Sequence, residues 1–585
     1  MAIAHTRGNQ LAVAAIDIGT TFSGYAFSFR SDFETSPTRI YTNDWSKEGA
    51  SNPEIKAPSV VLLNPDQSFN SFGYLAQTSY TELMDDTPET AQNYYFIKNF
   101  KMQLYDREIS LDMMITEVNG KEVKALKVFT DVIKYLKDHL LMQFTRKFGD
   151  FSIKDIFFVI TVPAIWSDAA KQFMREASER AGIGHLQMML AYEPEAAALY
   201  CSLLPEDQGI AKYFQEGRRI MVVDLGGGTV DITVIKIIKK SERMTYFEHV
   251  YKVSGGPWGG NTVNEKFEAF LCDVVGDDVI SEFRREYLAL YLEMVNDFEV
   301  KKKTSATNKV NIKVHGELVD LYKNIKSKDL KVELEKKFKQ EVKLVRDKLQ
   351  FSSAFIETFF EDCVGKIIKH INKTFAERGC CYPSTIVLVG GFSDSPLVCE
   401  SIKKAFPVVK DIVSPFGASF SVLKGSVIFG HDPTIFTGRV CRETIGVALH
   451  RPYDPKLHLQ EKTFKLCGKT RVDDCFEKMF SLNEVVKLGE TRSVQVHDHL
   501  SDHISQIRRT QPKFVEVYST IENEPIYVTD PGCKIKGKIT VNPPDGMWPE
   551  IVEGFIEMET GGTEITVRYR DKSSGHTTEG KIDFL

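Results

Sequence analysis

Two short segments that lie far apart in the sequence share one pattern: an apolar strand, an aspartate, and a glycine turn containing threonine. The first is IDIGTT at 16–21 and the second is VDLGGGTVD at 223–231. Glycine allows the backbone to turn sharply and to point N–H groups at an anion. An aspartate at the end of a strand suits hydrated Mg²⁺, which prefers carboxylate oxygen and keeps several waters. The pair predicts two turns that face each other around one metal-bound triphosphate.

A single copy of this pattern would be weak evidence, because a strand that ends in Asp-Gly is more often an ordinary hairpin. The prediction therefore depends on the two copies occurring together. Both copies continue into more strand, at 22–29 and 232–237, so each is predicted to be a β-hairpin. P-loops and dinucleotide-binding folds have phosphate turns that open a helix, and the chain contains no GxxxxGK[ST] motif.

Length and composition exclude several classes of protein. A chain of 585 residues is too long for one core, and we expect about three or four structural units. The net charge of -6 gives no general attraction to nucleic acid or to anionic membranes. The ten cysteines show no CxxC spacing, which indicates neither a zinc site nor a disulfide framework. With no signal-peptide pattern and no apolar run of about 18 residues, we expect a cytoplasmic protein without a membrane span.

The pattern of apolar residues divides the chain into two parts. From 11 to about 430, strands alternate with amphipathic helices, as in an α/β protein. The clearest pair is a strand at 155–163 followed by a helix at 167–181. Another buried strand, at 385–391, ends in paired glycines. Beyond about 435, short alternating runs separated by turn residues predict a small antiparallel β domain.

Six segments in this order resemble the heat shock 70 kDa protein family, part of the actin/hexokinase/heat-shock ATPase superfamily. They are IDIGTTFSG (16–24), FVITVPAIWSDAAKQFMREASERAGI (158–183), LAYEPEAAALY (190–200), VVDLGGGTVDITV (222–234), GGPWGGNTVNEKF (255–267) and IVLVGGFSDSP (386–396). Divergent details at 100–102, 298–302 and 422–430 look most like the 12A/12B branch of that family.

The resemblance implies a two-lobed α/β actin-like ATPase domain, built from duplicated ribonuclease H-like folds, followed by a small antiparallel β-sandwich domain. The implied boundaries are an ATPase domain at 1–430, with lobe I at about 1–210 and 385–430 and lobe II at about 211–384, a linker at 431–445, and a β-sandwich substrate-binding-like domain at 446–585. The chain ends at Leu585 without the family's helical lid, so we expect a bound peptide to exchange quickly.

The resemblance also implies a nucleotide site for ATP or ADP with Mg²⁺. The residues implied as catalytic are Asp17, Lys101, Glu193, Asp224, Thr229 and Asp231, of which Asp17, Asp224 and Asp231 would hold Mg²⁺ through water. The residues implied in nucleotide binding are Gly19, Thr20, Thr21, Phe22, Lys98, Gly226, Gly227, Gly228, Glu299, Lys302, Lys303, Gly390 and Gly391.

Within this set, Glu193 matches the glutamate that places the metal and the attacking water. A lysine should reach the terminal phosphate, and Lys101 is the first choice with Lys98 as the alternative. Each residue also has an ordinary structural interpretation, because threonine can cap a helix, glutamate is favoured at a helix N-terminus, and lysines occupy surfaces.

The chain departs from the family pattern at two places. Phe392 and Asp394 stand where the chaperones carry a small polar residue and an arginine that stacks on adenine, so adenine could be held more loosely. The segment from His431 to Ile445 lacks the acidic, leucine-rich linker of the chaperones. Communication between the nucleotide and the β domain could then be altered or absent.

The leading hypothesis is an ATP-binding, slowly hydrolysing chaperone-like protein of the stress response, which couples nucleotide to polypeptide binding. Its partners would be ATP, unfolded or client polypeptides, and a nucleotide-exchange factor or co-chaperone, with no nucleic acid. The alternatives are a nucleotide-gated scaffold or adaptor with vestigial hydrolysis, which needs only different affinities for two conformations, and a small-molecule kinase. Against the kinase stand the C-terminal β domain and the lack of an identifiable catalytic-base loop.

Overall fold

The computed structural model describes most of the chain. The residues outside the description are 1–9, 47–53, 150, 206–208, 304–308, 378–382, 467, 500–507, 544–545, 573–574, 576, 581 and 583.

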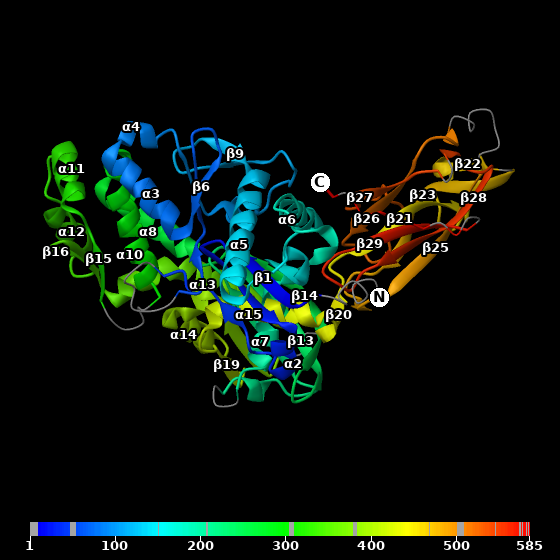
Figure 1. Ribbon diagram of the computed structural model, residues 1–585, viewed down its shortest axis with the longest axis horizontal. Coiled ribbons are helices and arrows are strands. Elements are labelled where there is room, and N and C mark those ends of the chain that lie inside the picture. Colours follow the sequence, from blue (N-terminus) through cyan, green and yellow to red (C-terminus); the bar gives the residue numbers. More distant parts are fainter. Residues whose placement is uncertain are drawn as a thin grey trace.

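Two mixed sheets with the same strand order form the centre of the larger part of the molecule (Figure 1). The first contains β1 (Ala12–Ile18), β2 (Phe22–Phe29), β3 (Tyr41–Thr42), β10 (Ile156–Val162) and β11 (Met188–Tyr192), with β4 (Ala57–Pro58) paired to β2. The second contains β12 (Arg219–Leu225), β13 (Val230–Lys240), β14 (Thr245–Gly256), β18 (Thr385–Val389), β19 (Asp411–Val413), β20 (Phe436–Val440) and β24 (Val485–Lys487).

The two sheets repeat one topology. The first runs β11-β10-β1-β2-β3 and the second begins β19-β18-β12-β13-β14. In each sheet, the strand that comes first in the chain (β1 or β12) pairs antiparallel with the next strand of the chain and parallel with the strand on its other side. Each predicted glycine turn therefore joins two antiparallel strands at equivalent places, as the sequence predicts. The α/β class of this part of the chain is confirmed.

Helices α7 (Glu193–Ser202) and α15 (Ser421–His431) form a layer that both sheets share. Alternate side chains of β1 and β12, such as Val13, Ala15, Ile220 and Val222, join these helices in one buried cluster. The intervening side chains face the opposite sides of their sheets. Both faces of each sheet are thus buried, which explains why the strands read as continuous apolar runs.

Outer helices cover the remaining face of each sheet. On the first sheet these are α5 (Ala125–Phe148) and α6 (Asp168–Arg180), where Ser167 caps α6 by accepting from Ala170 N–H at 3.2 Å. On the second they are α8 (Asn261–Val275), α10 (Leu288–Lys301), α13 (Ser353–Ala376) and α14 (Pro396–Ala405). The other α-helices of the described residues are α2 (Arg30–Thr35), α3 (Gly73–Asp86), α4 (Pro88–Ala91), α9 (Asp277–Glu286), α11 (Gly316–Lys326) and α12 (Leu330–Phe338).

Three small sheets extend the two lobes. They are formed by β5 (Val60–Leu63), β6 (Phe69–Phe72) and β7 (Tyr95–Lys98); by β8 (Met114–Thr116) and β9 (Glu122–Lys124); and by β15 (Val310–Lys313), β16 (Val342–Val345) and β17 (Lys348–Phe351). The last of these is inserted in the sequence between α10 and α13.

The division into lobes differs from the predicted one at 385–430. Strand β18 pairs in parallel with β12, so it belongs to the second sheet and not to the first lobe. The duplication explains this, because β18 takes the place in the second sheet that β10 takes in the first. Helix α15 does return to the first lobe, where it packs on β1, β10 and α7.

The segment predicted as a linker, 431–445, also differs. It contains β20, which pairs in parallel with β14 and antiparallel with β24. Residues 436–440 of this segment therefore form an integral strand of the second sheet, between a strand of the larger part and a strand of the C-terminal region.

Two antiparallel sheets make up the C-terminal region, at one end of the molecule beside α6 and β20 (Figure 1). The first contains β21 (Thr444–Pro452), β22 (Thr463–Leu466), β23 (Lys469–Phe480), β26 (Lys513–Thr520) and β27 (Lys534–Val541). The second contains β25 (Thr491–His499), β28 (Ile551–Glu559), β29 (Thr566–Asp571) and β30 (Thr577–Gly580). Side chains of both, including Val517, Ile539, Ile556 and Val567, share one buried cluster.

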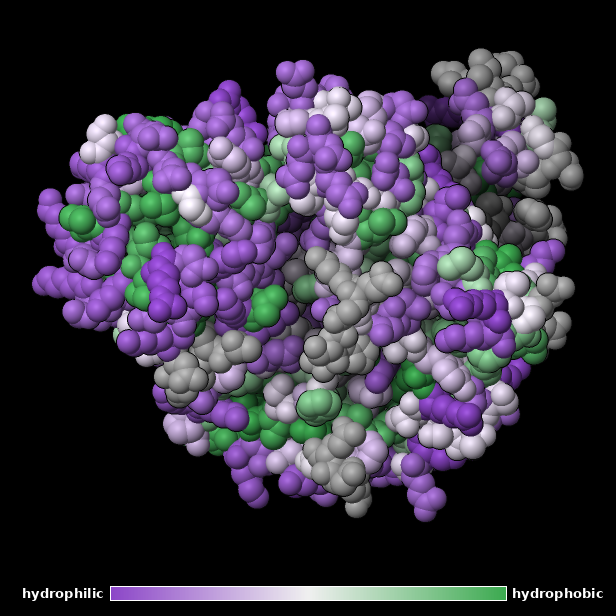
Figure 2. Space-filling model, turned by 60° about the vertical axis from the view of Figure 1, so that its left-hand side comes forward, coloured by the Kyte–Doolittle hydropathy of each residue, from purple (hydrophilic) through white to green (hydrophobic). Residues whose placement is uncertain are grey.

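The face of the molecule in Figure 2 is mostly hydrophilic, with apolar side chains in small separate groups. Within the described part of the chain, none of the helices has the length and apolar character needed to cross a membrane.

Gly425 in the middle of α15 tests the shared helical layer. A Cβ atom at this position would collide with the carbonyl of Ala196 in α7. We expect Gly425→Ala to lower the free energy of unfolding by about 1–3 kcal/mol, measured by urea denaturation, because the two helices must move apart. Gly365→Ala in α13 is the matched control, since that position is open, and it should stabilise the protein by up to about 1 kcal/mol. Equal effects of the two substitutions on the free energy of unfolding would contradict the close packing of α15 on α7.

Candidate nucleotide-binding site

The first predicted loop follows β1 and begins with Asp17. Both carboxylate oxygens have partners: Oδ1 accepts a hydrogen bond from Thr161 at 2.6 Å, and Oδ2 lies 2.5 Å from the ammonium of Lys56. Burial alone would raise the pKa of Asp17, but the ammonium groups of Lys56 and Lys101 hold the pKa below its usual value. Asp17 is therefore a buried carboxylate that stays ionised at neutral pH.

The second predicted loop, 226–228, is held by the start of α8. Its three carbonyls accept hydrogen bonds of 2.7–3.1 Å from the backbone N–H groups of residues 259–261. The peptide bonds are trans, so the N–H group of each unit points opposite to its carbonyl. The N–H groups of residues 227–229 therefore point away from α8, and successive N–H groups of this kind can bind an anion.

The two loops lie against each other. A Cβ atom at Gly227 would collide with the side chain of Thr21, and one at Gly228 would collide with that of Thr20. The Thr21 hydroxyl also donates to Asn261 Oδ1 at 3.2 Å, at the start of α8. A side chain at 227 would press on the first loop, and one at 228 would press on that loop and on Met102, so glycine at both positions lets the two loops lie this close.

Gly390, the first of the paired glycines after β18, packs against Asp224. Its φ is +84°, a conformation that L side chains rarely adopt, and a Cβ atom there would collide with Asp224 Oδ1 and the carbonyl of Leu225. The family resemblance implies a role for Gly390 in nucleotide binding. The structure places it against the carboxylate of the second loop.

Glu193, Asp224 and Asp231 complete a carboxylate cluster with Asp17. Burial is the largest effect on all three and raises their pKa values, that of Glu193 to about 7. The other carboxylates add to this, because Asp17, Glu193 and Asp231 each raise the pKa of Asp224, while Lys56 lowers it. The structure therefore brings the predicted acidic residues of both loops into one electrostatic unit.

Hydrogen bonds hold Asp231 and Glu193 in place. Asp231 accepts from the backbone N–H of Ile165 at 3.0 Å and from the Thr229 hydroxyl. Glu193, the first residue of α7, lies 2.7 Å from the ammonium of Lys101. The helix N-terminus also favours a negative charge there.

The charges of this cluster fit a divalent cation. Among the described residues, four buried carboxylates share the site with the ammonium groups of Lys56 and Lys101. Full ionisation leaves an excess of two negative charges, which one Mg²⁺ ion would neutralise. In the described ranges, no three His, Cys, Asp or Glu side chains are grouped so that they could ligate an ion directly.

The structure separates the two candidate lysines. Lys101, in the short 3₁₀ helix η1 (Phe100–Leu104), contacts Glu193, and its ammonium lies 5.4 Å from the ring centroid of Trp166. Lys98 ends β7, where burial lowers its pKa and the charges of Glu268 and Glu299 oppose that effect. Lys98 thus faces acidic residues of α8 and α10, while Lys101 belongs to the carboxylate cluster.

Three more residues implied in nucleotide binding, Glu299, Lys302 and Lys303, also come together. Lys302 is buried and donates to Glu299 at 2.5 Å, to Asn264 Oδ1 at 2.8 Å and to the carbonyl of Gly260 at 2.8 Å. Burial lowers the pKa of Lys302, and the charge of Glu299 opposes this shift. The ammonium of Lys303, two residues beyond α10, lies 5.2 Å from the ring centroid of Phe22, the residue that follows the first loop.

The two departures from the family pattern occupy the same region. Phe392 is buried and stacks on Phe360 with ring centroids 6.1 Å apart. Burial raises the pKa of Asp394, and the nearby ammonium of Lys303 lowers it. Gly391, next to Phe392, has room for a side chain, with Ser419 at 4.0 Å from a built Cβ. Close backbone approach therefore requires glycine at 390 and not at 391.

Sequence reasoning missed three residues of this site: Lys56, Thr161 and Asn261. Thr161 lies near the end of β10, a strand that the sequence predicts. Because β10 pairs in parallel with β1, its end lies beside Asp17, and this adjacency could have indicated Thr161. Asn261 follows a glycine pair in GGPWGGN at 255–261, a segment that carries the family resemblance. Lys56 has no motif of its own.

Comparison with known proteins decides the family. The family model described as Hsp70 protein matches residues 83–428, more than half of the chain. The chain belongs to the Hsp70 protein family. The match begins after the first loop, at 83.

Relatives in the 12A/12B branch match nearly the whole Hsp70-family chain. It is 31% identical to heat shock 70 kDa protein 12A of Mus musculus and 30% identical to the Homo sapiens protein of that name, in each case over 98% of this chain and 92% of the relative. It is 30% identical to heat shock 70 kDa protein 12B of Homo sapiens, over 98% of this chain and 91% of the relative. The predicted resemblance to this branch is confirmed.

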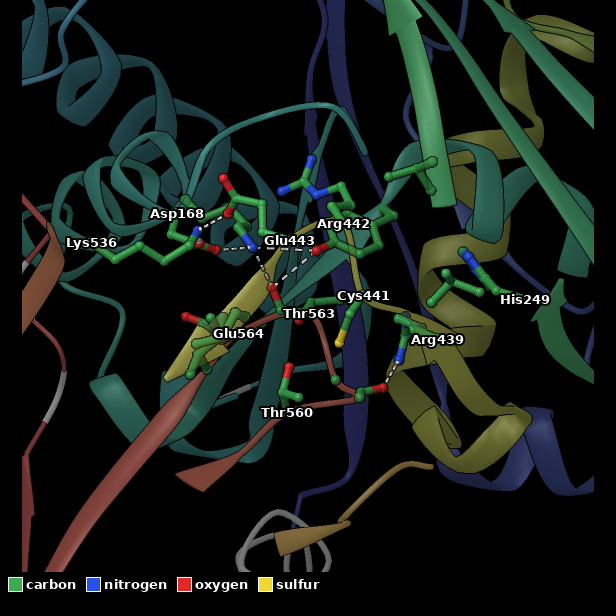
Figure 3. A pocket seen from close by; sticks show the side chains of 18 residues that line it. Asp168, His249, Arg439, Cys441, Arg442, Glu443, Lys536, Thr560, Thr563 and Glu564 are labelled. Carbon is green, nitrogen blue, oxygen red and sulfur yellow. Dashed lines mark hydrogen bonds and ion pairs between the residues drawn. The ribbon is translucent and has the colours of Figure 1, made fainter. Parts of the chain in front are cut away.

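In this Hsp70-family chain a second polar site joins the ATPase lobes to the C-terminal sheets (Figure 3). Arg439 of β20 forms two contacts with Glu195, at 2.7 and 2.6 Å, and donates to the carbonyl of Gly561 at 2.7 Å. His249 Nε2 lies 2.8 Å from Glu195. Burial would raise the pKa of Glu195, but Arg439 and His249 lower it to about 2.

Further ion pairs lie at the same junction, and those of Lys536 with Asp168 and of Arg175 with Glu564 cross it. Lys536 lies 2.6 Å from Asp168 and 2.7 Å from Glu443, and Lys171 lies 2.6 Å from Asp168. Lys171 also donates to the carbonyl of Thr563 at 2.9 Å. Arg175 of α6 and Glu564 form two further contacts, at 2.8 and 2.5 Å. The C-terminal sheets are thus attached through charged groups to α6 and the segment around β20.

Arg442 connects this junction to the nucleotide-binding site. Its guanidinium donates to the carbonyls of Ala164 and Trp166 at 3.1 and 3.0 Å. Ile165, between them, donates its N–H group to Asp231. The short loop at 164–166 therefore contacts Asp231 of the carboxylate cluster and also Arg442, which lies two residues before β21.

The buried Arg439–Glu195 pair can be tested against a surface pair. Arg439→Met should lower the free energy of unfolding by about 3–5 kcal/mol, because it leaves the buried Glu195 carboxylate without its guanidinium. Adding Glu195→Gln should recover part of this loss. The control is Arg180→Met. Arg180 pairs with Glu176 at 2.8 Å on the surface, so this substitution should lower the free energy of unfolding by at most about 1 kcal/mol.

The same pair predicts a sign for the acid dependence of stability, measured by urea denaturation. The pKa of Glu195 is lowered on folding from 4.5 to about 2, so its contribution is complete above the unfolded pKa and is lost as pH falls toward the folded one. Glu195→Gln should make stability fall less steeply below pH 4.5. An unchanged slope would contradict the ion pair.

Proposed function

We propose that this protein binds ATP, hydrolyses it slowly, and couples nucleotide binding to the binding of polypeptide, as a chaperone-like member of the Hsp70 family. The observation that carries the proposal is the cluster formed by the two glycine loops, in which Asp17, Asp224 and Asp231 meet Glu193 and Lys101. Family membership supports nucleotide binding by this cluster.

Asp17, Asp224 and Asp231 would hold Mg²⁺ through water. The ion would neutralise charge on the phosphates. The chain's own groups supply the rest: the N–H groups of residues 227–229 orient the phosphates, Lys101 approaches the terminal one, and Glu193 orients the attacking water. Phosphoryl transfer to water needs mainly such positioning and charge neutralisation, with no covalent nucleophile.

In the same proposal, the two C-terminal sheets form a β-sandwich that binds polypeptide. Their shared apolar cluster supports the sandwich. The contacts from Asp231 through Ile165 to Arg442 support coupling, because a change at the nucleotide alters a loop that Arg442 binds.

One observation favours the alternative, a nucleotide-gated scaffold with vestigial hydrolysis. Lys101 and Glu193 bind each other at 2.7 Å, and each must separate from the other to act on phosphate or water. Closure around a nucleotide requires no hydrolysis, only different affinities for the two conformations.

Single-turnover hydrolysis of labelled ATP, run beside equilibrium binding, separates the two. We expect slow release of phosphate from the wild-type protein and a rate about a hundredfold lower in Asp224→Asn, which removes one charge from the cluster. Asp112→Asn is the control, because the Asp112 side chain is exposed and pairs with Lys124 at the surface. Tight binding without phosphate release, unchanged by Asp224→Asn, would favour the scaffold.

Polypeptide coupling needs its own test. We expect a labelled unfolded peptide to bind the full chain, and ATP to change its dissociation constant by about fivefold or more, measured by fluorescence anisotropy. Arg442→Gln should weaken this effect of ATP while leaving ATP binding intact, since it removes contacts to the loop at 164–166. Arg180→Gln on the surface of α6 is the control. No peptide binding at high micromolar concentration would contradict the polypeptide part of the proposal.

A further inference from the structure

The side chain of Phe416 lies almost fully in solvent. It is 94% exposed, the highest fraction among the large apolar side chains of the described residues. Single exposed apolar residues are ordinary on protein surfaces, so exposure alone gives Phe416 no role. Its place beside the second glycine loop does.

Three neighbouring parallel strands of the second sheet end at one edge, and Phe416 follows the last of them. Strand β12 pairs in parallel with β18, and β18 pairs in parallel with β19. They lead into the loop at 226–228, the glycines at 390–391 and the turn at 414–418, respectively. Ligands of open α/β sheets bind at the carboxyl ends of such strands. With strands about 4.8 Å apart, the turn lies roughly 10 Å from the second glycine loop along this edge.

Hydrogen bonds tie the turn at 414–418 to the paired glycines. The carbonyl of Ala418 accepts from the N–H group of Gly390 at 3.2 Å, and the Ser414 hydroxyl donates to the Ser393 hydroxyl at 3.5 Å. These contacts come two residues before and two residues after Phe416. The backbone that carries Phe416 is therefore held against the segment at 390–393.

The turn itself is stiff. Pro415 has one fixed backbone dihedral, and Gly417 has a φ of +70°, a conformation that glycine adopts without strain. The carbonyl of Pro415 accepts from the N–H group of Ala418 at 3.2 Å and closes the turn. Phe416 lies in the middle of this closed turn, so little backbone entropy is lost when a ligand binds its ring.

The surface beside the turn leaves room for a flat ring. Gly391 has no side chain, and Ser419 Cβ, at 4.0 Å, is the only atom near a Cβ built there. Phe392 offers no ring to this space, because it is buried and stacked on Phe360. Aromatic side chains stack on nucleobases of any kind, because every base has a π-face. Phe416 is thus an aromatic face at the edge of the sheet where the second glycine loop lies.

We propose that Phe416 binds the base of the nucleotide by stacking, while the loop at 226–228 binds its phosphates. The turn at 414–418 then forms the base end of the site, and the ligand is a nucleoside triphosphate held in part by an aromatic face. This inference rests on the proposed function. The competing interpretation is an exposed phenylalanine with no part in nucleotide binding.

The test compares ATP with inorganic tripolyphosphate, which has no base, by equilibrium binding to the full chain in Mg²⁺. Phe416→Ala should weaken ATP binding by about tenfold or more, the loss expected for one aromatic–base stack, and should leave the dissociation constant of tripolyphosphate unchanged. Phe416→Tyr keeps the aromatic face and should bind ATP like the wild type. Val408→Ala is the control, because Val408 is 75% exposed and lies just before β19.

Tryptophan fluorescence gives a second readout that needs no hydrolysis. ATP should change the emission of Phe416→Trp, because a base stacks on the new indole, and tripolyphosphate should not. The wild-type protein, with its four tryptophans, gives the background. Urea denaturation of Phe416→Ala should match that of the wild type, because the deleted side chain is exposed. A loss of ATP binding then cannot be attributed to unfolding.

The inference is overturned if Phe416→Ala binds ATP with the wild-type dissociation constant, or if it weakens ATP and tripolyphosphate equally. It is also overturned if Phe416→Tyr loses as much ATP binding as Phe416→Ala. Failure of the wild-type protein to bind ATP has a different meaning, since it contradicts the proposed function on which the inference rests.

Discussion

The placement of four carboxylates with two lysines at the meeting of two loops is the constraint on which the rest of the site depends. Buried carboxylates are costly unless they are paired or hydrogen-bonded. In this protein Asp17 has Thr161 and Lys56, Asp231 has a backbone N–H group, and Glu193 has Lys101. The remaining excess of negative charge makes the site a binding place for cations. The glycines at 227 and 228 let the loops lie close enough for this charge to be shared.

The sequence predicts the positions of the two turns well because the pattern is local. Strand, aspartate and glycine turn follow one another in each copy, and the structure puts both turns at equivalent places of equivalent sheets. The choice between Lys98 and Lys101 is not local. It depends on Asn99, whose φ of 52° gives a left-handed turn between β7 and η1. That turn sends the two lysines to different neighbours, and a spacing of three residues does not reveal it.

Lys56 and β20 could not be predicted for a related reason. The position of Lys56 depends on pairing between β4, a strand of only two residues, and β2. The segment at 431–445 has neither the leucine-rich run of the chaperones nor a long apolar strand, so its composition resembles a linker. Its place in the sheet depends on buried ionic contacts of Arg439 with Glu195 and on backbone pairing with β14. The Arg439–Glu195 contacts and the β20–β14 pairing each join residues more than a hundred positions apart in the sequence.

The first turn of α7 connects these two groups of contacts. Glu193 binds Lys101 in the nucleotide site, and Glu195, two residues later, binds Arg439 of β20. Pro194 between them fixes one backbone dihedral, so the two carboxylates lie on a short, stiff segment. A ligand that draws Lys101 away from Glu193 changes the electrostatic balance at the start of the same turn. That change reaches the C-terminal sheets only if α7 or the loop at 163–166 has two distinct positions, because coupling between sites requires an element whose equilibrium both sites bias.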